Sequence, residues 1–239
     1  EISGGIEINN VSFSYDPDSP PAIDDDTEGT YEGLYLNRFT QATYVPGSIF
    51  KIVTLAAALE TIPGIQDQVF TCSGTYVIQN GDITCQRSHG TQSLKEAFSN
   101  SCNCAFAEIA KLVGKDNMKK YVQQFKVTDS VSFDGISTAK GNYDVSEAIP
   151  VELAWSGIGQ YTDLINPCAF MQFMGAIGGN GVAARPYLVE SVRVGETVTY
   201  EAKTEKGNRI LSKDVANILE DYMRNNVSTV YGDWNFPGL

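Results

Sequence analysis

The pattern of apolar and polar positions predicts strands towards both ends of the chain and helices between them. Residues 6–15 alternate loosely between apolar and polar side chains, which is typical of a strand. Residues 48–60 are apolar on nearly every side, which predicts a helix buried by its neighbours. We expect Ser48 to cap this helix and Pro63-Gly64 to end it.

Local capping signals mark further helices along the chain. Ser93 and Glu96 form a capping-box pattern, and Asn166-Pro167 is a favourable helix start. Residues 187–200 favour strands joined by a turn. The further predicted helices span residues 94–100, 103–113, 116–125, 150–157, 167–177 and 212–225. Because strands and helices are segregated along the chain rather than alternating, the pattern indicates an α+β fold.

A predicted β-hairpin carries two of the five cysteines. Asn80-Gly81 favours a two-residue type I′ turn, which would pair Tyr76 with Cys85. Cys72 lies four residues before Tyr76, and a bend at Gly74 could bring Cys72 close to Cys85. One interpretation is therefore a disulfide between Cys72 and Cys85, which would indicate an oxidising, extracytoplasmic environment.

A zinc site is the alternative interpretation of these cysteines. Its ligands would be Cys72, Cys85, His89 and Cys102, although the spacing contains no Cys-x-x-Cys pair. His89 also fits a structural hydrogen bond in a loop. The cysteines outside the hairpin fit buried thiols that act as small apolar side chains; they are Cys102, Cys104 and Cys168.

Composition and charge narrow the classes of partner. With 239 residues, 42% hydrophobic and 19% charged, the chain is typical of one large globular domain or two small ones. The formal net charge of −12 repels nucleic acid and anionic lipid, so neither is an expected partner. No apolar run reaches the length of a transmembrane helix, and no signal-peptide pattern opens the chain.

The sharpest candidate for chemistry is the run Pro46-Gly47-Ser48-Ile49-Phe50-Lys51. A serine and a lysine three residues apart at a helix start lie on the same side, one turn apart. The helix N–H groups favour negative charge developing at Ser48, and burial would lower the pKa of Lys51 so that its amine can accept the serine proton. A second Ser-x-x-Lys, at residues 137–140, lies in a polar, irregular stretch and is interpreted as a chance match.

A second candidate motif, Ser101-Cys102-Asn103, follows about fifty residues later and is the only Ser-x-Asn in the chain. It falls between two predicted helices, where side chains can project into a cleft. The Ser101 hydroxyl can relay a proton, and the Asn103 amide can bind a substrate carbonyl or peptide N–H. Taken alone, the motif also fits a helix cap.

Together the two motifs resemble the first two active-site motifs of penicillin-binding proteins and serine β-lactamases. The Ser-x-Asn form is closer to penicillin-binding proteins, and residues 36–48, 89–97 and 156–181 resemble the class B, high-molecular-weight type. The resemblance implies the penicillin-binding protein/serine β-lactamase-like fold, with a helical subdomain and an antiparallel sheet covered by helices on both faces. It also implies that residues 1–239 belong to one transpeptidase domain.

The third motif of that family, Lys-Thr/Ser-Gly, does not occur in these 239 residues. The resemblance places it on a cleft-lining strand after the helix at 212–225. Lys203-Thr204-Glu205 is no substitute, since it lacks the glycine and precedes that helix. We therefore expect the sheet to be incomplete in this chain. We also expect this stretch to be impaired on its own, because losing one oxyanion-hole donor costs about 100- to 1,000-fold in rate.

The activity implied by the resemblance is that of a peptidoglycan D,D-transpeptidase. A D-Ala-D-Ala stem peptide would acylate Ser48, with Lys51 accepting the serine proton. Ser101 would pass a proton to the departing D-alanine, and Asn103 would hold the peptide. The acyl group would then pass to an acceptor amine and cross-link the cell wall. β-Lactam antibiotics would acylate the same serine.

The resemblance also implies a setting, with stem peptides, β-lactams and other cell-wall synthesis proteins of division or elongation as partners. The expected location is the extracytoplasmic face of the bacterial membrane, with an anchor preceding this chain. The chemistry needs no metal or organic cofactor. Two alternatives stay open: a D,D-carboxypeptidase or β-lactamase, and a non-catalytic β-lactam sensor or binding module.

Overall fold

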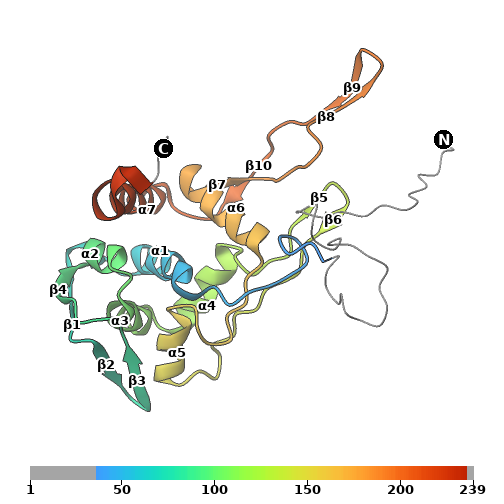
Figure 1. Cartoon of the computed structure of the whole chain (residues 1–239). Coiled ribbons are helices and arrows are strands. Elements are labelled where there is room, and N and C mark those ends of the chain that lie inside the picture. Colours follow the sequence, from blue (N-terminus) through green and yellow to red (C-terminus); the bar gives the residue numbers. More distant parts are fainter. Residues whose placement is uncertain (1–35, 236–239) are drawn as a thin grey trace, which may run out of the picture. The chain divides into compact units, whose positions relative to one another are not determined.

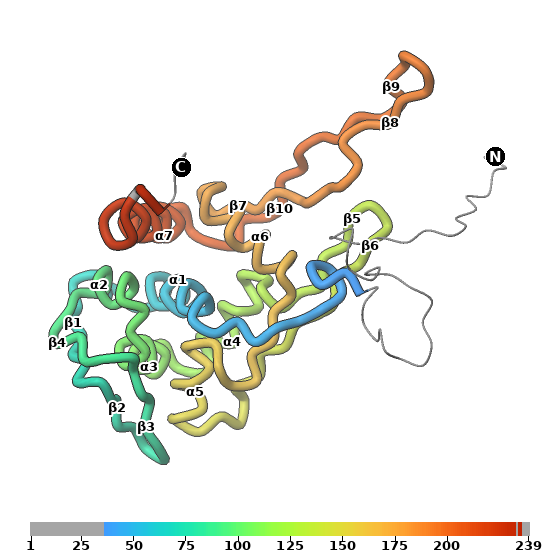
Figure 2. Tube along the Cα trace, in the orientation of Figure 1, coloured from blue at the N-terminus to red at the C-terminus, as the bar shows by residue number. Residues whose placement is uncertain are grey.

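The computed structural model of the chain describes residues 36–235 (Figures 1 and 2). Contacts divide the chain into Glu1–Leu36 and Asn37–Leu239, and the description below concerns the second unit. The strand predicted at residues 6–15 lies outside the described residues.

Helices form most of the regular structure in the described part. None of them is long and apolar enough to cross a bilayer. They are η1 (Gly47–Phe50), α1 (Lys51–Thr61), η2 (Ile65–Asp67), α2 (Leu94–Ser99), α3 (Asn103–Val113), α4 (Lys115–Gln124), α5 (Pro150–Ser156), α6 (Pro167–Gly178), α7 (Lys213–Asn225), η3 (Asn226–Gly232) and η4 (Asp233–Asn235).

The strands form two-stranded antiparallel pairs, β1–β4, β2–β3, β5–β6, β7–β10 and β8–β9. No pair gains a third strand among the described residues, so the sheet expected from the resemblance is incomplete there. The hairpin β8–β9 projects away from the helices in Figure 1, and all its residues are exposed. The strands are β1 (Val69–Cys72), β2 (Thr75–Ile78), β3 (Gly81–Thr84), β4 (Gly90–Ser93), β5 (Ser132–Phe133), β6 (Ile136–Ser137), β7 (Val182–Ala184), β8 (Ser191–Val194), β9 (Thr197–Glu201) and β10 (Lys206–Arg209).

Helix α1 is the buried centre of this unit. Its side chains Val53 and Leu55 are fully buried, and α3, α4 and α7 pack against it. The prediction of a helix covered on several sides is therefore confirmed. The predicted N-cap role of Ser48 is wrong, because the chain enters α1 through the 3-10 turn η1, and no side chain caps either element.

Several other helices begin at the residues that the sequence indicated. Ser93 and Glu96 form the predicted capping box at α2. The Asn166 side chain accepts hydrogen bonds from the first N–H groups of α6, and Ser212 accepts one from Val215 at α7. These caps satisfy main-chain donors that would otherwise lack a partner at a helix start.

The register of the β2–β3 hairpin differs from the prediction. Tyr76 pairs with Ile83 rather than with Cys85, and Ile78 pairs with Gly81. The turn therefore uses Gln79 and Asn80. Of these two, only Asn80 has a positive φ, 73°, whereas a type I′ turn needs two such residues.

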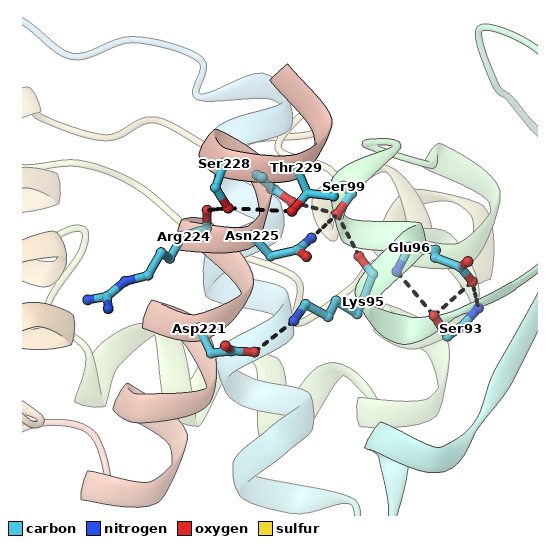
Figure 3. Close-up of polar contacts among 10 residues, drawn as sticks. Ser93, Lys95, Glu96, Ser99, Asp221, Arg224, Asn225, Ser228 and Thr229 are labelled. Atoms are coloured by element: carbon cyan, nitrogen blue, oxygen red, sulfur yellow. Dashed lines mark hydrogen bonds and ion pairs between the residues drawn. The ribbon is translucent and has the colours of Figure 1, made fainter. Parts of the chain in front are cut away.

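Helix α7 docks on α2 through apolar and polar contacts. Figure 3 shows Lys95 reaching Asp221, with Nζ 2.8 Å from Oδ2, and Asn225 beside Ser99. Such an exposed ion pair contributes only about 0–1 kcal/mol. The buried Leu219 and Tyr222 of α7 give the larger contribution, because they remove apolar surface from water.

Candidate active site

The structure brings Ser48, Ser101 and Asn103 around the amine of the fourth predicted site residue, Lys51. This side chain begins α1 and is only 1% exposed. Its Nζ donates to the Ser101 carbonyl at 2.7 Å and to Asn103 Oδ1 at 2.7 Å. The same nitrogen lies 2.9 Å from Ser101 Oγ and 3.2 Å from Ser48 Oγ. One amine therefore lies within hydrogen-bond reach of both hydroxyls.

Burial sets the protonation of this amine. Loss of solvation lowers the pKa of Lys51 to about 8, against a smaller opposing effect of the thiols of Cys85 and Cys102. A neutral amine is thus accessible near neutral pH. Held beside a serine hydroxyl, it can act as a general base.

The candidate nucleophile Ser48 is exposed and sits in the turn η1. The Gly47 N–H donates to the Gly159 carbonyl at 3.0 Å. Gly159 has φ +78°, and a Cβ there would collide with the Gly47 carbonyl oxygen. The turn after α5 thus supports the backbone of the nucleophile directly. Sequence reasoning gave Gly159 no role, although the glycine stands within the stretch that resembled the family.

The loop between α2 and α3 presents Ser101 and Asn103 to Lys51. Ser101 adopts a left-handed conformation at φ 49°. The helix-cap role falls to Cys102, whose Sγ accepts from the Ala105 N–H, and this leaves the side chains on either side of Cys102 free for the site. Asn103 Nδ2 donates to the Thr84 carbonyl at 2.9 Å, which orients its Oδ1 towards Lys51. The contribution of Thr84 was missed because a main-chain carbonyl has no sequence signal.

Comparison with known proteins identifies the family. The model of the penicillin-binding protein transpeptidase domain matches residues 10–237. This chain belongs to the penicillin-binding protein transpeptidase family.

Relatives and solved structures of this family agree with the assignment. Peptidoglycan D,D-transpeptidase PbpA of Mycolicibacterium smegmatis is 34% identical over 197 residues, which cover 79% of this chain and 40% of that protein. The D,D-transpeptidase domain of a peptidoglycan glycosyltransferase from Eggerthella lenta has a TM-score of 0.77 at 26% identity, covering 87% of this chain and 54% of that chain. Penicillin-binding protein A of Mycobacterium tuberculosis, as a penicillin G acyl-enzyme complex, has a TM-score of 0.71 at 26% identity, covering 80% and 45%. The chain thus spans about half or less of each of these proteins.

The second Ser-x-x-Lys does not form a comparable pair. Ser137 lies exposed on β6, and its Oγ lies 2.9 Å from Ser132 Oγ. No hydrogen bond joins Ser137 to Lys140 within the described part of the chain. Lys140 is exposed, whereas Lys51 is buried.

The cysteines do not form the predicted disulfide in this structure. All five carry free thiols, including Cys72 and Cys85. Because the hairpin register differs from the predicted one, Gly74 rather than Tyr76 lies opposite Cys85, and the Cys85 N–H donates to the Gly74 carbonyl at 2.9 Å. The two sulfurs instead belong to a cluster with His89 and Cys102.

Proposed function

We propose that this chain carries the nucleophile, base and second motif of a peptidoglycan D,D-transpeptidase. The observation that supports this most is the position of Lys51 Nζ, 3.2 Å from Ser48 Oγ and 2.9 Å from Ser101 Oγ. The family is one whose relatives include proteins named D,D-transpeptidase. We propose that residues 1–239 belong to the transpeptidase domain.

In the proposed reaction, Ser48 Oγ attacks the carbonyl of the penultimate D-alanine while Lys51 takes the serine proton. The Ser48 N–H, in the turn η1, stabilises the oxyanion of the tetrahedral intermediate. As the C–N bond breaks, a proton passes through Ser101 Oγ to the departing D-alanine amine. An acceptor amine of a second stem peptide then attacks the acyl-enzyme, and Ser48 recovers its proton.

Asn103 and Ser101 have different roles in this scheme. Asn103 is engaged by Lys51 through Oδ1 and by Thr84 through Nδ2, so it holds the amine and the edge of the site in place. Of these two residues, only Ser101 has a hydroxyl, which contacts the Lys51 amine and can exchange its proton. β-Lactams would acylate Ser48 in the same way; a relative has been solved as its penicillin G acyl-enzyme.

Covalent labelling with a fluorescent penicillin tests the proposal on the native protein that contains this chain. We expect Ser48→Ala to abolish labelling, because the attacking oxygen is removed. Ser137→Ala is the matched control, since Ser137 belongs to the other Ser-x-x-Lys and should label like the parent. Equal labelling of Ser48→Ala and the parent would refute the role of Ser48.

The lifetime of the label separates the remaining activities. A persistent adduct, together with cross-linking of stem peptides by the native protein, supports the transpeptidase. Rapid release of hydrolysed penicillin would support the carboxypeptidase or β-lactamase alternative, and a persistent adduct without turnover of stem peptide would support the sensor.

We further propose that full activity needs the family's third motif, which these 239 residues do not contain. Its lysine and its strand would supply carboxylate binding and a second oxyanion donor. We expect the 239-residue chain to be acylated about 100-fold or more slowly than the native protein. Equal rates would show that residues 1–239 suffice.

The proposed location is the extracytoplasmic face of the membrane, because the peptidoglycan substrate lies outside the membrane. A membrane anchor and partners among cell-wall synthesis proteins stay predictions from the resemblance. Membrane fractionation and co-purification from cells would test both.

A further inference from the structure

Four metal-ligating side chains converge directly behind the second motif. They are Cys72, Cys85, His89 and Cys102, and their ligand atoms all lie within 4.8 Å of one another. Cys72 ends β1, Cys85 and His89 lie in the loop from β3 to β4, and Cys102 precedes α3. In Figure 1 these elements gather on one side of the described unit.

The separations between these ligand atoms fit a tetrahedral zinc ion. Cys85 Sγ lies 3.9 Å from Cys102 Sγ and 3.6 Å from His89 Nδ1. With Zn–S bonds of about 2.3 Å and Zn–N bonds of about 2.0–2.1 Å, tetrahedral geometry places two sulfurs about 3.8 Å apart and a sulfur and a nitrogen about 3.6 Å apart. Since all the ligand atoms lie within 4.8 Å of one another, the two that are farthest apart need to approach by only about 1 Å to reach these distances.

We propose that Cys72, Cys85, His89 and Cys102 bind one Zn²⁺ ion in a structural Cys₃His site. Three thiolates and one imidazole are ligands that zinc favours, and four protein ligands close the tetrahedron. On binding, the three thiols release their protons to solvent as three S–Zn bonds form. His89 binds through the Nδ1 lone pair and keeps its proton on Nε2.

Main-chain N–H groups point at two of the three sulfurs. The Asn103 N–H donates to Cys85 Sγ at 3.3 Å, and the Ala105 N–H donates to Cys102 Sγ at 3.5 Å. Main-chain donors of this kind stabilise negative sulfur and orient metal ligands. Cys72 and Cys102 are buried, whereas Cys85 and His89 are partly exposed, which leaves a route for the ion to enter.

A disulfide is the competing use of these residues, but it explains less of the geometry. It would join two sulfurs through loss of two electrons to an external oxidant. The third thiol would then have no function, and neither would the orientation of His89 Nδ1 towards Cys85. Convergence of four ligand atoms from three separate segments favours the metal.

Because of the position of Cys102, zinc binding would also affect catalysis. This effect on catalysis rests on the proposed function. Cys102 stands between Ser101 and Asn103, so the ion would tie the second motif to β1 and to the β3–β4 loop. We infer that zinc positions Ser101 and Asn103 against Lys51 without touching substrate.

Metal analysis of the native protein tests the site. Protein purified under reducing conditions without chelator should contain one zinc per chain. Cys85→Ser and His89→Ala should lose the zinc, because each removes a ligand. The loss of affinity should exceed the about 10- to 100-fold seen when a residue that only hydrogen-bonds to a metal ligand is changed. Cys104→Ala is the matched control: this buried thiol follows Asn103 on α3 but is not one of the four ligands, so zinc should be retained. His89→Cys should restore binding through a fourth thiolate.

Cobalt keeps the test independent of how well the variants fold. Zinc-free parent protein, reduced and still folded, should bind one Co²⁺ with the sulfur-to-cobalt charge-transfer absorption of a thiolate site, and Zn²⁺ should displace it. Failure of the folded, reduced parent to bind either ion would overturn the proposal. So would a disulfide among Cys72, Cys85 and Cys102 in protein isolated from its own compartment.

Penicillin labelling then separates this proposal from the proposed function. Ser48→Ala should keep its zinc while losing the label. Zinc removal from the parent should slow labelling, and adding Zn²⁺ back should restore the rate. Zinc binding without any labelling of the parent would count against the proposed function alone.

Discussion

The proposed chemistry depends on the burial and the hydrogen bonds of one side chain, Lys51. Its amine contacts two hydroxyls, an amide oxygen and a carbonyl. Among the described residues, no carboxylate lies within ion-pair distance of it. Burial lowers the pKa of Lys51 to about 8, and the nearby sulfurs of Cys85 and Cys102 oppose this shift only in part. Sequence spacing predicted the proximity of Ser48, but only the folded structure adds Ser101 and Asn103.

The rate of Ser48 acylation should rise with pH up to about 8 and level off above it. Below its pKa the Lys51 amine carries a proton and cannot accept the one from Ser48. Between pH 6 and pH 8 the neutral fraction rises roughly 50-fold. Second-order rate constants for penicillin acylation across this range measure the effect. A flat profile would show that Lys51 is not the base.

Asp163 is a second buried ionisable residue, and it should reduce stability as pH rises. It is 0% exposed, and neither carboxylate oxygen has a hydrogen-bond partner at normal geometry. Burial raises the pKa of Asp163 to about 8, against a weaker opposing effect of the Tyr161 backbone. Because the folded pKa exceeds the unfolded value of about 3.9, the folded state binds more protons between these two values, so stability falls as pH rises from about 4 to 8.

The substitution Asp163→Asn removes this charge while keeping the shape of the side chain. We expect the variant to be more stable than the parent at pH 8, by on the order of a few kcal/mol. The difference should shrink towards pH 5. Thermal unfolding at the two pH values measures it, and an identical pH dependence in parent and variant would contradict the buried-charge explanation.

At the scale of elements, the site depends on backbone segments that approach one another closely. Thr54 Oγ1 in α1 donates to the Gly157 carbonyl at 2.7 Å. A Cβ at Gly157 would collide with the Cβ of Ala110 in α3, and one at Gly159 would collide with the Gly47 carbonyl oxygen. The C-terminal end of α5 therefore locks η1, α1 and α3 together.

Gly159→Ala should disturb this contact. The positive φ of 78° and the collision with Gly47 both oppose a Cβ, so we expect a stability loss of on the order of 1–3 kcal/mol and slower acylation. The control is Gly175→Ala in α6, where a Cβ would have no neighbour within 4 Å. That change should be neutral or stabilise by up to about 1 kcal/mol. Equal effects of the two substitutions, measured by denaturant unfolding, would contradict the close-approach argument.

Helices and strands were predicted correctly where the sequence signal lies within a few residues of the element. Helix starts at Ser93 and Asn166 were predicted because caps act within three or four residues. The β2–β3 register was missed, since it depends on which residue takes the left-handed conformation. The sequence indicated that the motif at residues 101–103 fits a helix cap but did not single out Cys102, which is an uncommon capping residue.

At the scale of the whole described unit, one hydrophobic cluster joins α1 to the helices around it. The buried Leu219 of α7 belongs to this cluster, and α7 packs against α1, α2 and α6. The hydrogen bonds of the Lys51 amine go to Ser48, Ser101 and Asn103, and none of these residues belongs to α7. Stability and catalytic geometry can therefore be perturbed separately.

Leu219→Ala should lower stability by about 2–5 kcal/mol, because it leaves a cavity in the buried cluster. The control is Leu112→Ala on α3, a side chain that is 50% exposed and should cost about 0.5 kcal/mol or less. Denaturant unfolding measures both. At a temperature where the Leu219 variant stays folded, penicillin labelling should match the parent; a lost label in folded protein would show that α7 also shapes the site.

Local patterns predicted the α+β class and most helix starts, and two short motifs with their family resemblance indicated the four site residues Ser48, Lys51, Ser101 and Asn103. These are encoded by periodicity, caps and short motifs that act over a few residues. The folded arrangement was needed to show that Ser101 and Asn103 reach Lys51, that Gly159 supports the nucleophile turn, and that three cysteines lie close to His89. Such contacts join residues that are far apart along the chain. The distances between these residues depend on how the buried helices and strands pack, and a local sequence pattern does not contain this information.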